Sequence, residues 1–179
     1  RVQQNWTFTS PAINKMYGDA AFTNPINEIG IQDTIAYTSS NTDVATVDEN
    51  GQVTIKAAST GVVTITAKTE GTTNYSSATA SYTLTVAKKA ISVSGITAAN
   101  KTYDGKTTAT LDCSKAVFAG KLENDTLTVT ATGTFADKNA GENKTVTIAD
   151  LTLDGASAGN YTLAASSQQR ETSASITPA

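Results

Sequence analysis

Apolar and polar residues alternate along most of this chain in short runs. In residues 61–67, Val63, Ile65 and Ala67 take one set of alternate positions, and polar Thr64 and Thr66 take the other. Residues 81–86 repeat this alternation. A period of two residues predicts strands that bury one face. No segment keeps an apolar stripe at a spacing of 3.6 residues, so we expect minimal helix.

Further strands follow from the same pattern, with turn residues between them. The pair Asn50-Gly51 separates two of these runs, and both residues tolerate positive φ, so it predicts a hairpin. The remaining strands are predicted at residues 6–9, 34–38, 44–47 and 53–55 in the first half, and at 91–94, 126–130, 145–148, 151–153 and 161–163 and around Ile176 in the second.

About seven short strands per half, each with one apolar face, are typical of an antiparallel sandwich. We therefore predict an all-β chain of two tandem immunoglobulin-like β-sandwiches, with domains at residues 1–87 and 88–179. The join at residues 87–90 has no Gly-, Ser- or Pro-rich spacer. A joint this short leaves little reach, so we expect the sandwiches to lie end to end in a semi-rigid rod longer than roughly 70 Å.

Two short motifs occur twice, at one offset of about 86 positions. In each copy we expect the tyrosine of the Asn-Tyr pair to cover an open end of its sandwich, with its hydroxyl on a backbone group. A period of this size suits a small domain, so the repeats are interpreted as structural. The repeated residues are Tyr17 and Asp19 against Tyr103, Asp104 and Gly105, and Asn74-Tyr75 against Asn160-Tyr161.

Composition narrows the class of protein. Threonine supplies 33 of the 179 residues, which suits solvent-facing strand positions. A net charge of −3 without a basic patch disfavours nucleic acid as a partner. No apolar run reaches the roughly 20 residues of a membrane span, and no signal-peptide pattern is visible. Since Arg1 opens the chain without a methionine, we expect a fragment or mature piece of a longer protein.

Chemistry is sparse. The chain has no histidine, which removes Ser-His-Asp and Cys-His catalysis and histidine zinc sites. Cys113 is the single cysteine and is interpreted as a small half-buried residue, in preference to a reactive thiol. Calcium was considered at Asp43, Asp48 and Glu49 and at Glu123 and Asp125, but neither cluster has the spacing of a calcium loop. We therefore expect no catalytic residues, no metal and no cofactor.

Three other features have a functional and a structural interpretation. Trp6, the only tryptophan, could bind sugar, but it shares a strand face with Phe8 and is assigned to the core. Asn-x-Ser/Thr triplets, such as the one at Asn5, would be glycosylation acceptors in a eukaryotic secreted chain, and here they are attributed to chance. Lys15 and Lys101 occupy matching positions and could form cross-links to asparagine, although solvated lysines are the simpler expectation.

The sequence also resembles two known families. Residues 35–54, with Ser39-Ser40-Asn41 before the Val44–Val47 run and the Gly51 turn, resemble the bacterial immunoglobulin-like group 2 signature, and the match covers most of residues 10–87. Residues 101–109, 135–144 and 159–163, with the triplet Tyr103-Asp104-Gly105, resemble the YDG family over nearly all of residues 88–179. The first half departs from this triplet, since it has Tyr17-Gly18-Asp19.

The resemblance implies strings of modules within large bacterial surface or secreted proteins, including adhesins, without catalytic residues. We accordingly expect a non-catalytic spacer, stalk or weakly adhesive segment, located outside the cell or on the cell wall of a Gram-positive bacterium. Its partners would be neighbouring modules and surface glycans or proteins. The alternative is a carbohydrate-binding module attached to an extracellular glycan-degrading enzyme, which would need an exposed coplanar aromatic pair.

Overall fold

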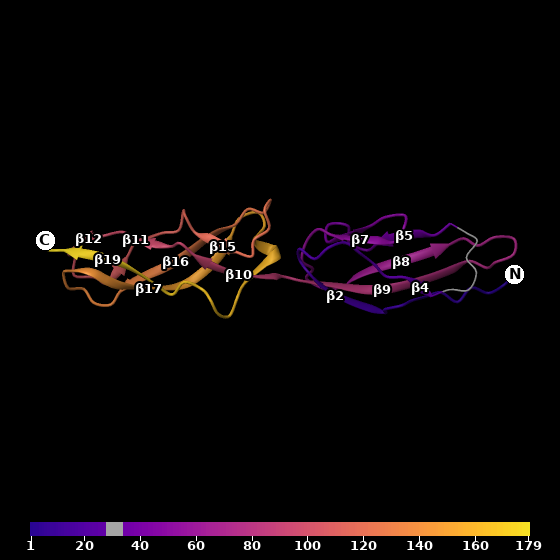
Figure 1. Cartoon of the computed structure of the whole chain (residues 1–179), viewed down its shortest axis with the longest axis horizontal. Coiled ribbons are helices and arrows are strands. Elements are labelled where there is room, and N and C mark those ends of the chain that lie inside the picture. The colour runs from indigo at the N-terminus through magenta and orange to yellow at the C-terminus, as the bar shows by residue number, and fades with distance from the viewer. Residues whose placement is uncertain (28–33) are drawn as a thin grey trace. The chain divides into compact units, whose positions relative to one another are not determined.

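The computed structural model describes residues 1–27 and 34–179, and it is all-β apart from one short 3-10 turn, η1 (Ala158–Asn160). The chain divides into two compact units, Arg1–Lys89 and Ala90–Ala179, each of which contains its own packed strands (Figure 1). Each unit has the architecture of a β-sandwich. The two units are described separately below.

The larger sheet of unit 1 has four strands in the order β2-β9-β8-β5. β8 and β9 form an antiparallel pair in which Ile65 lies opposite Tyr82 and Val63 opposite Leu84, and all four side chains are buried. β2 runs parallel to β9, the last strand of the unit, whereas β5 is antiparallel to β8. The bounds are β2 Ala12–Met16, β5 Ala36–Ser39, β8 Val63–Thr69 and β9 Ala78–Ala87.

The smaller sheets of unit 1 complete its core. The predicted Asn50-Gly51 hairpin is present: it joins β6 (Ala45–Val47) to β7 (Gln52–Ile55), and Gly51 has φ of +78°. A β-carbon at Gly51 would lie 2.9 Å from Cζ of Tyr37, so the turn is also closely packed. The other strands are β3 (Phe22–Thr23) beside β7, and β1 (Thr7–Phe8) paired with β4 (Ile26–Asn27).

Unit 2 is built around a five-stranded sheet in the order β12-β19-β17-β16-β13. β16 and β17 form an antiparallel hairpin at the centre of this sheet, and its register shifts between Thr130 and Thr132. Phe135, Val146 and Ile176 are buried together on the inner face. The bounds are β12 Lys101–Thr102, β13 Thr108–Ala109, β16 Thr128–Phe135, β17 Gly141–Asp154 and β19 Glu171–Thr177.

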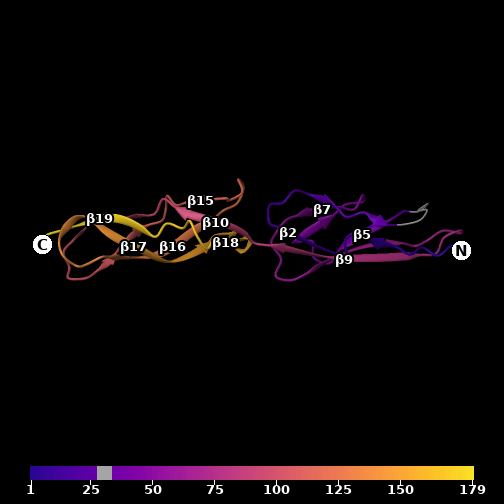
Figure 2. The ribbon, with the colours of Figure 1, turned by 60° about the horizontal axis from the view of Figure 1, so that its bottom comes forward.

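Shorter strands supply the remaining sheets of unit 2 (Figure 2). β10 (Lys89–Ser94) lies between β15 (Val117–Ala119) and β18 (Tyr161–Leu163), and β11 (Thr97–Ala98) pairs with β14 (Leu111–Asp112). Val93, Ile96, Val129 and Ile148 form a second buried cluster, against which Cys113 packs partly buried.

The sequence pattern missed several features of this fold, among them the short strands β3, β4 and β11 to β15. Residues 145–148 and 151–153 are parts of one strand, β17. This strand continues through Asp150, although that residue has a φ of 54°. β2 was not predicted, since its sequence Ala-Ile-Asn-Lys-Met has only a half-buried alternation. The joint is also shorter than expected, because Lys88 alone separates β9 from β10.

Candidate functional site

The first repeated motif has the same structural position in both units. β2 and β12, which precede the two triplets, each run parallel to the last strand of their unit. The backbone N–H of Tyr17 donates to the carbonyl of Ala87 over 2.9 Å, and that of Tyr103 donates to Thr177 over 2.8 Å. The motif therefore continues the parallel pairing by one residue and then turns the chain away from the sheet.

The two turns differ in detail. In unit 1, Asp19 Oδ2 accepts from the backbone N–H of Met16 over 2.9 Å, and Gly18 has φ of 92°. In unit 2, Asp104 Oδ1 accepts from the N–H of Lys106 over 2.9 Å, and Gly105 has φ of 76°. Exchanging the order of Gly and Asp therefore moves the left-handed residue and the accepting carboxylate by one position each.

Exposure of the repeated tyrosines also differs between the copies. Tyr17 is 9% exposed, whereas the matching Tyr103 is 41% exposed. Asn74 is exposed and Tyr75 half-buried, whereas Asn160 is half-buried and Tyr161 only 2% exposed. Equivalent sequence positions thus have different environments, because the side chains around them are not repeated.

Lys101 is held on the edge of unit 2, and the expectation of a solvated lysine is wrong here. Its Nζ donates to Asp104 Oδ1 over 2.9 Å and to the carbonyls of Lys106 and Thr108 over 2.8 and 3.0 Å. The side chain is 18% exposed, and Nζ lies 5.3 Å from the centre of the Phe135 ring. The hydrogen bond from Lys101 lowers the pKa of the Asp104 carboxyl.

Lysine side chains form hydrogen bonds within two other loops of unit 2. Lys144 Nζ donates to Asp137 Oδ1 over 2.6 Å and thereby lowers the pKa of that carboxyl. Lys121 Nζ donates to the carbonyls of Leu122 and Asp125 over 3.1 and 2.8 Å. In unit 1, Lys15 is half-buried with Nζ 4.8 Å from the centre of the Phe22 ring. These contacts give the lysines a structural role.

Tyr161 of the second motif is part of a buried polar contact. Its hydroxyl accepts from the backbone N–H of Leu122 over 2.9 Å and donates to Asp125 Oδ2. Tyr75 in unit 1 instead forms an isolated parallel bridge with Val2, and the carbonyl of Asn74 accepts from the Val2 N–H over 2.7 Å. The expected contact between the tyrosine hydroxyl and a backbone group is thus present at Tyr161, where it fixes the loop before β16.

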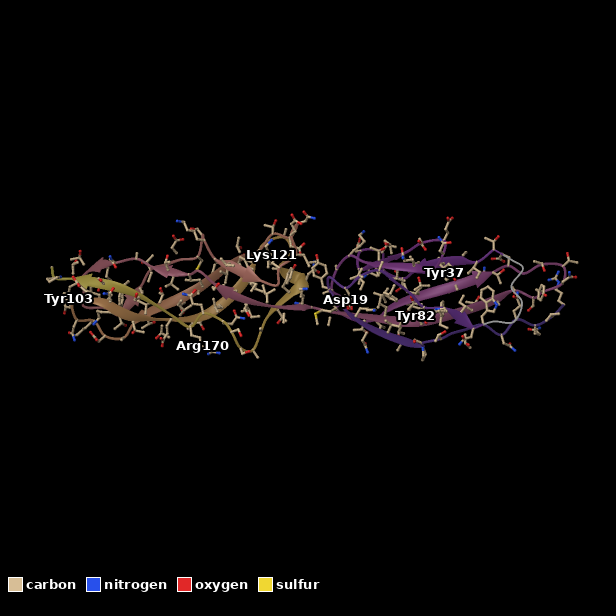
Figure 3. The ribbon with its side chains drawn as sticks, in the orientation of Figure 1. Asp19, Tyr37, Tyr82, Tyr103, Lys121 and Arg170 are labelled. Atoms are coloured by element: carbon tan, nitrogen blue, oxygen red, sulfur yellow. The ribbon has the colours of Figure 1, made fainter. Side chains whose placement is uncertain are left out.

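The two motifs lie at opposite ends of unit 2. Tyr103 follows β12, which is paired with the end of β19, whereas Lys121, next to the partner of Tyr161, lies toward the other end of the unit (Figure 3). None of the depressions beside Ser175, Thr42 and Ala165 is lined by residues of both motifs. In unit 2 the two motifs are therefore separate structural elements and do not form one site.

Charged side chains do not assemble into a metal centre in the described part of the chain. No group of three or more His, Cys, Asp or Glu side chains there is placed to hold an ion. At the acidic turn of unit 1, Asp48 Oδ1 accepts from the N–H groups of Asn50 and Gln52 over 2.9 and 2.8 Å. This carboxylate therefore stabilises the hairpin turn.

The aromatic residue that was weighed as a sugar platform is buried. Trp6 is 7% exposed, as is Phe8, and the Phe8 ring packs edge-on against Tyr82 with the ring centres 4.6 Å apart. The expected assignment of Trp6 to the core is confirmed. Within residues 1–27 and 34–179, Tyr103 is the single aromatic residue among the exposed large hydrophobic side chains.

Short hydroxyl side chains lie on the outer face of the large sheet in each unit. In unit 1, Thr64 lies opposite Thr83, and Thr66 opposite Ser81, with the last two hydroxyl oxygens 2.9 Å apart. In unit 2, the outer residues Thr134 and Thr147 lie opposite one another on β16 and β17. Short hydroxyl side chains cover both faces, so each can offer many weak hydrogen bonds.

No described helix is long and apolar enough to cross a membrane.

Comparisons with known proteins assign parts of both units. Residues 87–169 match the model of the YDG domain, and residues 29–69 match a model described as "Intimin, immunoglobulin-like domain". The YDG match ends before β19, so residues 176–179, which also resemble the end of that family, lie outside it. Neither match names the immunoglobulin-like group 2 family or a bacterial origin.

Among solved structures, the chain is similar to Drosophila N-cadherin EC1-4, with 10% identity and a TM-score of 0.33 over 98% of this chain and 51% of that one. It is also similar to Drosophila N-cadherin EC1-3, with 12% identity and a TM-score of 0.30 over 97% and 68%. The chain spans about half the length of the EC1-4 chain. No curated protein matches it. Residues 87–169 are thus similar to the YDG domain, and residues 29–69 are similar to an immunoglobulin-like domain of intimin.

Proposed function

We propose that this chain is a pair of non-catalytic structural and adhesive modules from a bacterial surface or secreted protein. Its role is to act as a spacer or stalk that holds other domains away from the cell, while its own faces add weak contacts. Its partners are neighbouring modules of the same polypeptide and, through the sheet faces, a surface glycan or protein. The matches with an immunoglobulin-like domain of intimin and with the YDG domain support this class of protein.

The observation that carries the proposal is the junction. β9 closes unit 1, β10 opens unit 2, and Lys88 is the single residue between them. A one-residue connection has almost no reach, so the two strands cannot separate like domains on a flexible tether. Such a junction suits a protein whose task is to keep a distance.

The adhesive part of the proposal rests on the hydroxyl-covered faces. The outer rows of β8 and β9 contain short polar side chains, and Lys68 is paired with Glu70 over 2.5 Å at their margin. The many small hydrogen-bonding groups of these rows favour weak, multivalent contact. The intimin-type match gives no support to a Gram-positive origin, so location is proposed only as extracellular or on the cell surface.

Small-angle X-ray scattering tests the spacer role. The wild-type chain should have a maximum dimension above roughly 70 Å, because two ten-residue strands of about 33 Å each, together with the loops at their ends, would lie in line. A matched variant with a flexible Gly-Ser linker inserted after Lys88 should give a broader distribution of dimensions. A compact globule in the wild type, or identical profiles for both proteins, would refute the spacer. Substrate turnover by the purified chain would refute the non-catalytic assignment.

A further inference from the structure

Two buried polar atoms in unit 1 have no protein partner among the described residues. They are Nε1 of Trp6 and the hydroxyl oxygen of Tyr82. Trp6 is 7% exposed and Tyr82 2% exposed, so bulk solvent does not reach either group. A buried donor or hydroxyl without a hydrogen bond costs about 1–3 kcal/mol, and native proteins rarely leave one in that state.

Both groups belong to one part of the core. The Phe8 ring packs edge-on against the Tyr82 ring, and Trp6 precedes Phe8 by two positions, which places both on the same side of the chain. Tyr82 projects inward from β9, and Tyr37 lies in the same unit on β5 (Figure 3). Burial, and secondly the nearby Tyr37, raises the pKa of Tyr82 to about 12.

The inward positions on one side of Tyr82 are small, although Ile65 lies directly opposite it and Leu84 is the next inward residue on β9. Ala80 on β9 lies opposite Ala67 on β8, and Ala78 lies opposite Thr69, all of them buried. The Thr69 hydroxyl already accepts from the N–H of Gly71 over 3.2 Å. Methyl groups and one engaged hydroxyl therefore line this part of the interior, which offers little protein polarity to pair with the indole N–H and the phenol hydroxyl.

We propose that one ordered water molecule binds in this part of the core, held by the indole N–H of Trp6 and the hydroxyl of Tyr82. Water fits the chemistry because it can accept from the indole and also donate to, or accept from, the phenol. A buried water normally makes about three hydrogen bonds to groups that would otherwise be unpaired. The site is a structural one, and it is independent of the spacer and adhesive roles.

Nuclear magnetic resonance of the full chain tests this inference, because Trp6 is the only tryptophan and gives one indole N–H signal. That proton should show a dipolar cross-peak to water. Rotating-frame spectra separate this contact from proton exchange, since the two give cross-peaks of opposite sign. Absence of the dipolar cross-peak in the wild type overturns the proposal.

The variant Tyr82→Phe provides the second arm. If the water is shared, the variant weakens or loses the indole–water cross-peak and lowers the denaturation midpoint of unit 1. A cross-peak that persists unchanged overturns the shared site. A raised midpoint also overturns it, because removing a hydroxyl that had no partner would stabilise the core. Tyr161→Phe in unit 2 is the matched control, which should leave the indole cross-peak unchanged.

Discussion

The hydroxyl of Tyr161 should stabilise unit 2 to an extent that one substitution can measure. Tyr161→Phe keeps the ring, which is 2% exposed, and removes the oxygen that contacts the Leu122 N–H and the Asp125 carboxylate. A hydrogen bond to a charged group contributes about 1.5–3 kcal/mol, and an unpaired buried amide costs about 1–3 kcal/mol. Leu122 and Asp125 are only half-buried, so water replaces part of the loss, and we expect a net cost of about 2 kcal/mol.

The chain contains its own reference for this measurement. Trp6 lies in unit 1, so its fluorescence follows the unfolding of that unit, whereas far-ultraviolet circular dichroism follows both units. A domain of this size changes its midpoint by roughly 4–8 °C per kcal/mol, so the transition of unit 2 should fall by about 8–16 °C. The fluorescence transition of unit 1 should not move.

Tyr103→Phe is the matched control in the same unit, because Tyr103 is 41% exposed. Its effect should stay within about 0.5 kcal/mol. If Tyr161→Phe is as neutral as this control, the contacts of the Tyr161 hydroxyl do not stabilise the loop before β16. If both transitions fall together, the units do not unfold independently.

Two further predictions concern unit 2. The lowered pKa values of Asp104, Asp112 and Asp137, caused mainly by hydrogen bonds from Lys101, Ser114 and Lys144, favour the folded state above the ordinary aspartate value of 3.8, and this stability is lost as the pH falls below it. The urea midpoint of unit 2 should therefore fall between pH 5 and pH 2, the range over which aspartate titrates. Asp137→Asn should make this fall smaller. If the midpoint of the variant falls as steeply with pH as that of the wild type, the hydrogen-bonded aspartates are not the cause. Gly133→Ala should destabilise by about 1–3 kcal/mol, because its β-carbon would lie 2.7 Å from Leu111 Cδ2. Gly159→Ala, whose β-carbon would meet nothing within 4 Å, should change the stability by no more than about 0.5 kcal/mol. Both glycine variants can be measured by differential scanning calorimetry, and equal losses of stability would contradict the packing argument.

Much of the fold could be predicted because its strands obey a strict alternation. Residues 63–69 and 78–87 bury every second side chain, so their period was visible in the sequence. β2 and β12 could not be found this way. They are held by parallel pairing with the final strand of their unit, a contact between residues more than 70 positions apart that leaves only a weak local pattern.

The candidate site residues were found through repetition, but their environments were not. The sequence shows Tyr17 and Tyr103 as equivalents, and burial of one and exposure of the other depend on side chains that the repeat does not share. Lys101 likewise looks like an ordinary surface lysine, since two of its three acceptors are backbone carbonyls, which any residue could supply. The unpaired Trp6 and Tyr82 groups also depend on tertiary packing that alternation does not describe.

The parallel pairing of β2 with β9 and of β12 with β19 has a mechanical consequence. When a chain is pulled from its two ends, hydrogen bonds between neighbouring parallel strands are loaded together in shear, and they resist until all yield at once. Unit 1 has five paired positions in this clasp, from Ala12 to Met16, whereas unit 2 has two, at Lys101 and Thr102. Under tension, unit 2 should therefore rupture first and lengthen the tether, while unit 1 remains intact as the stronger link.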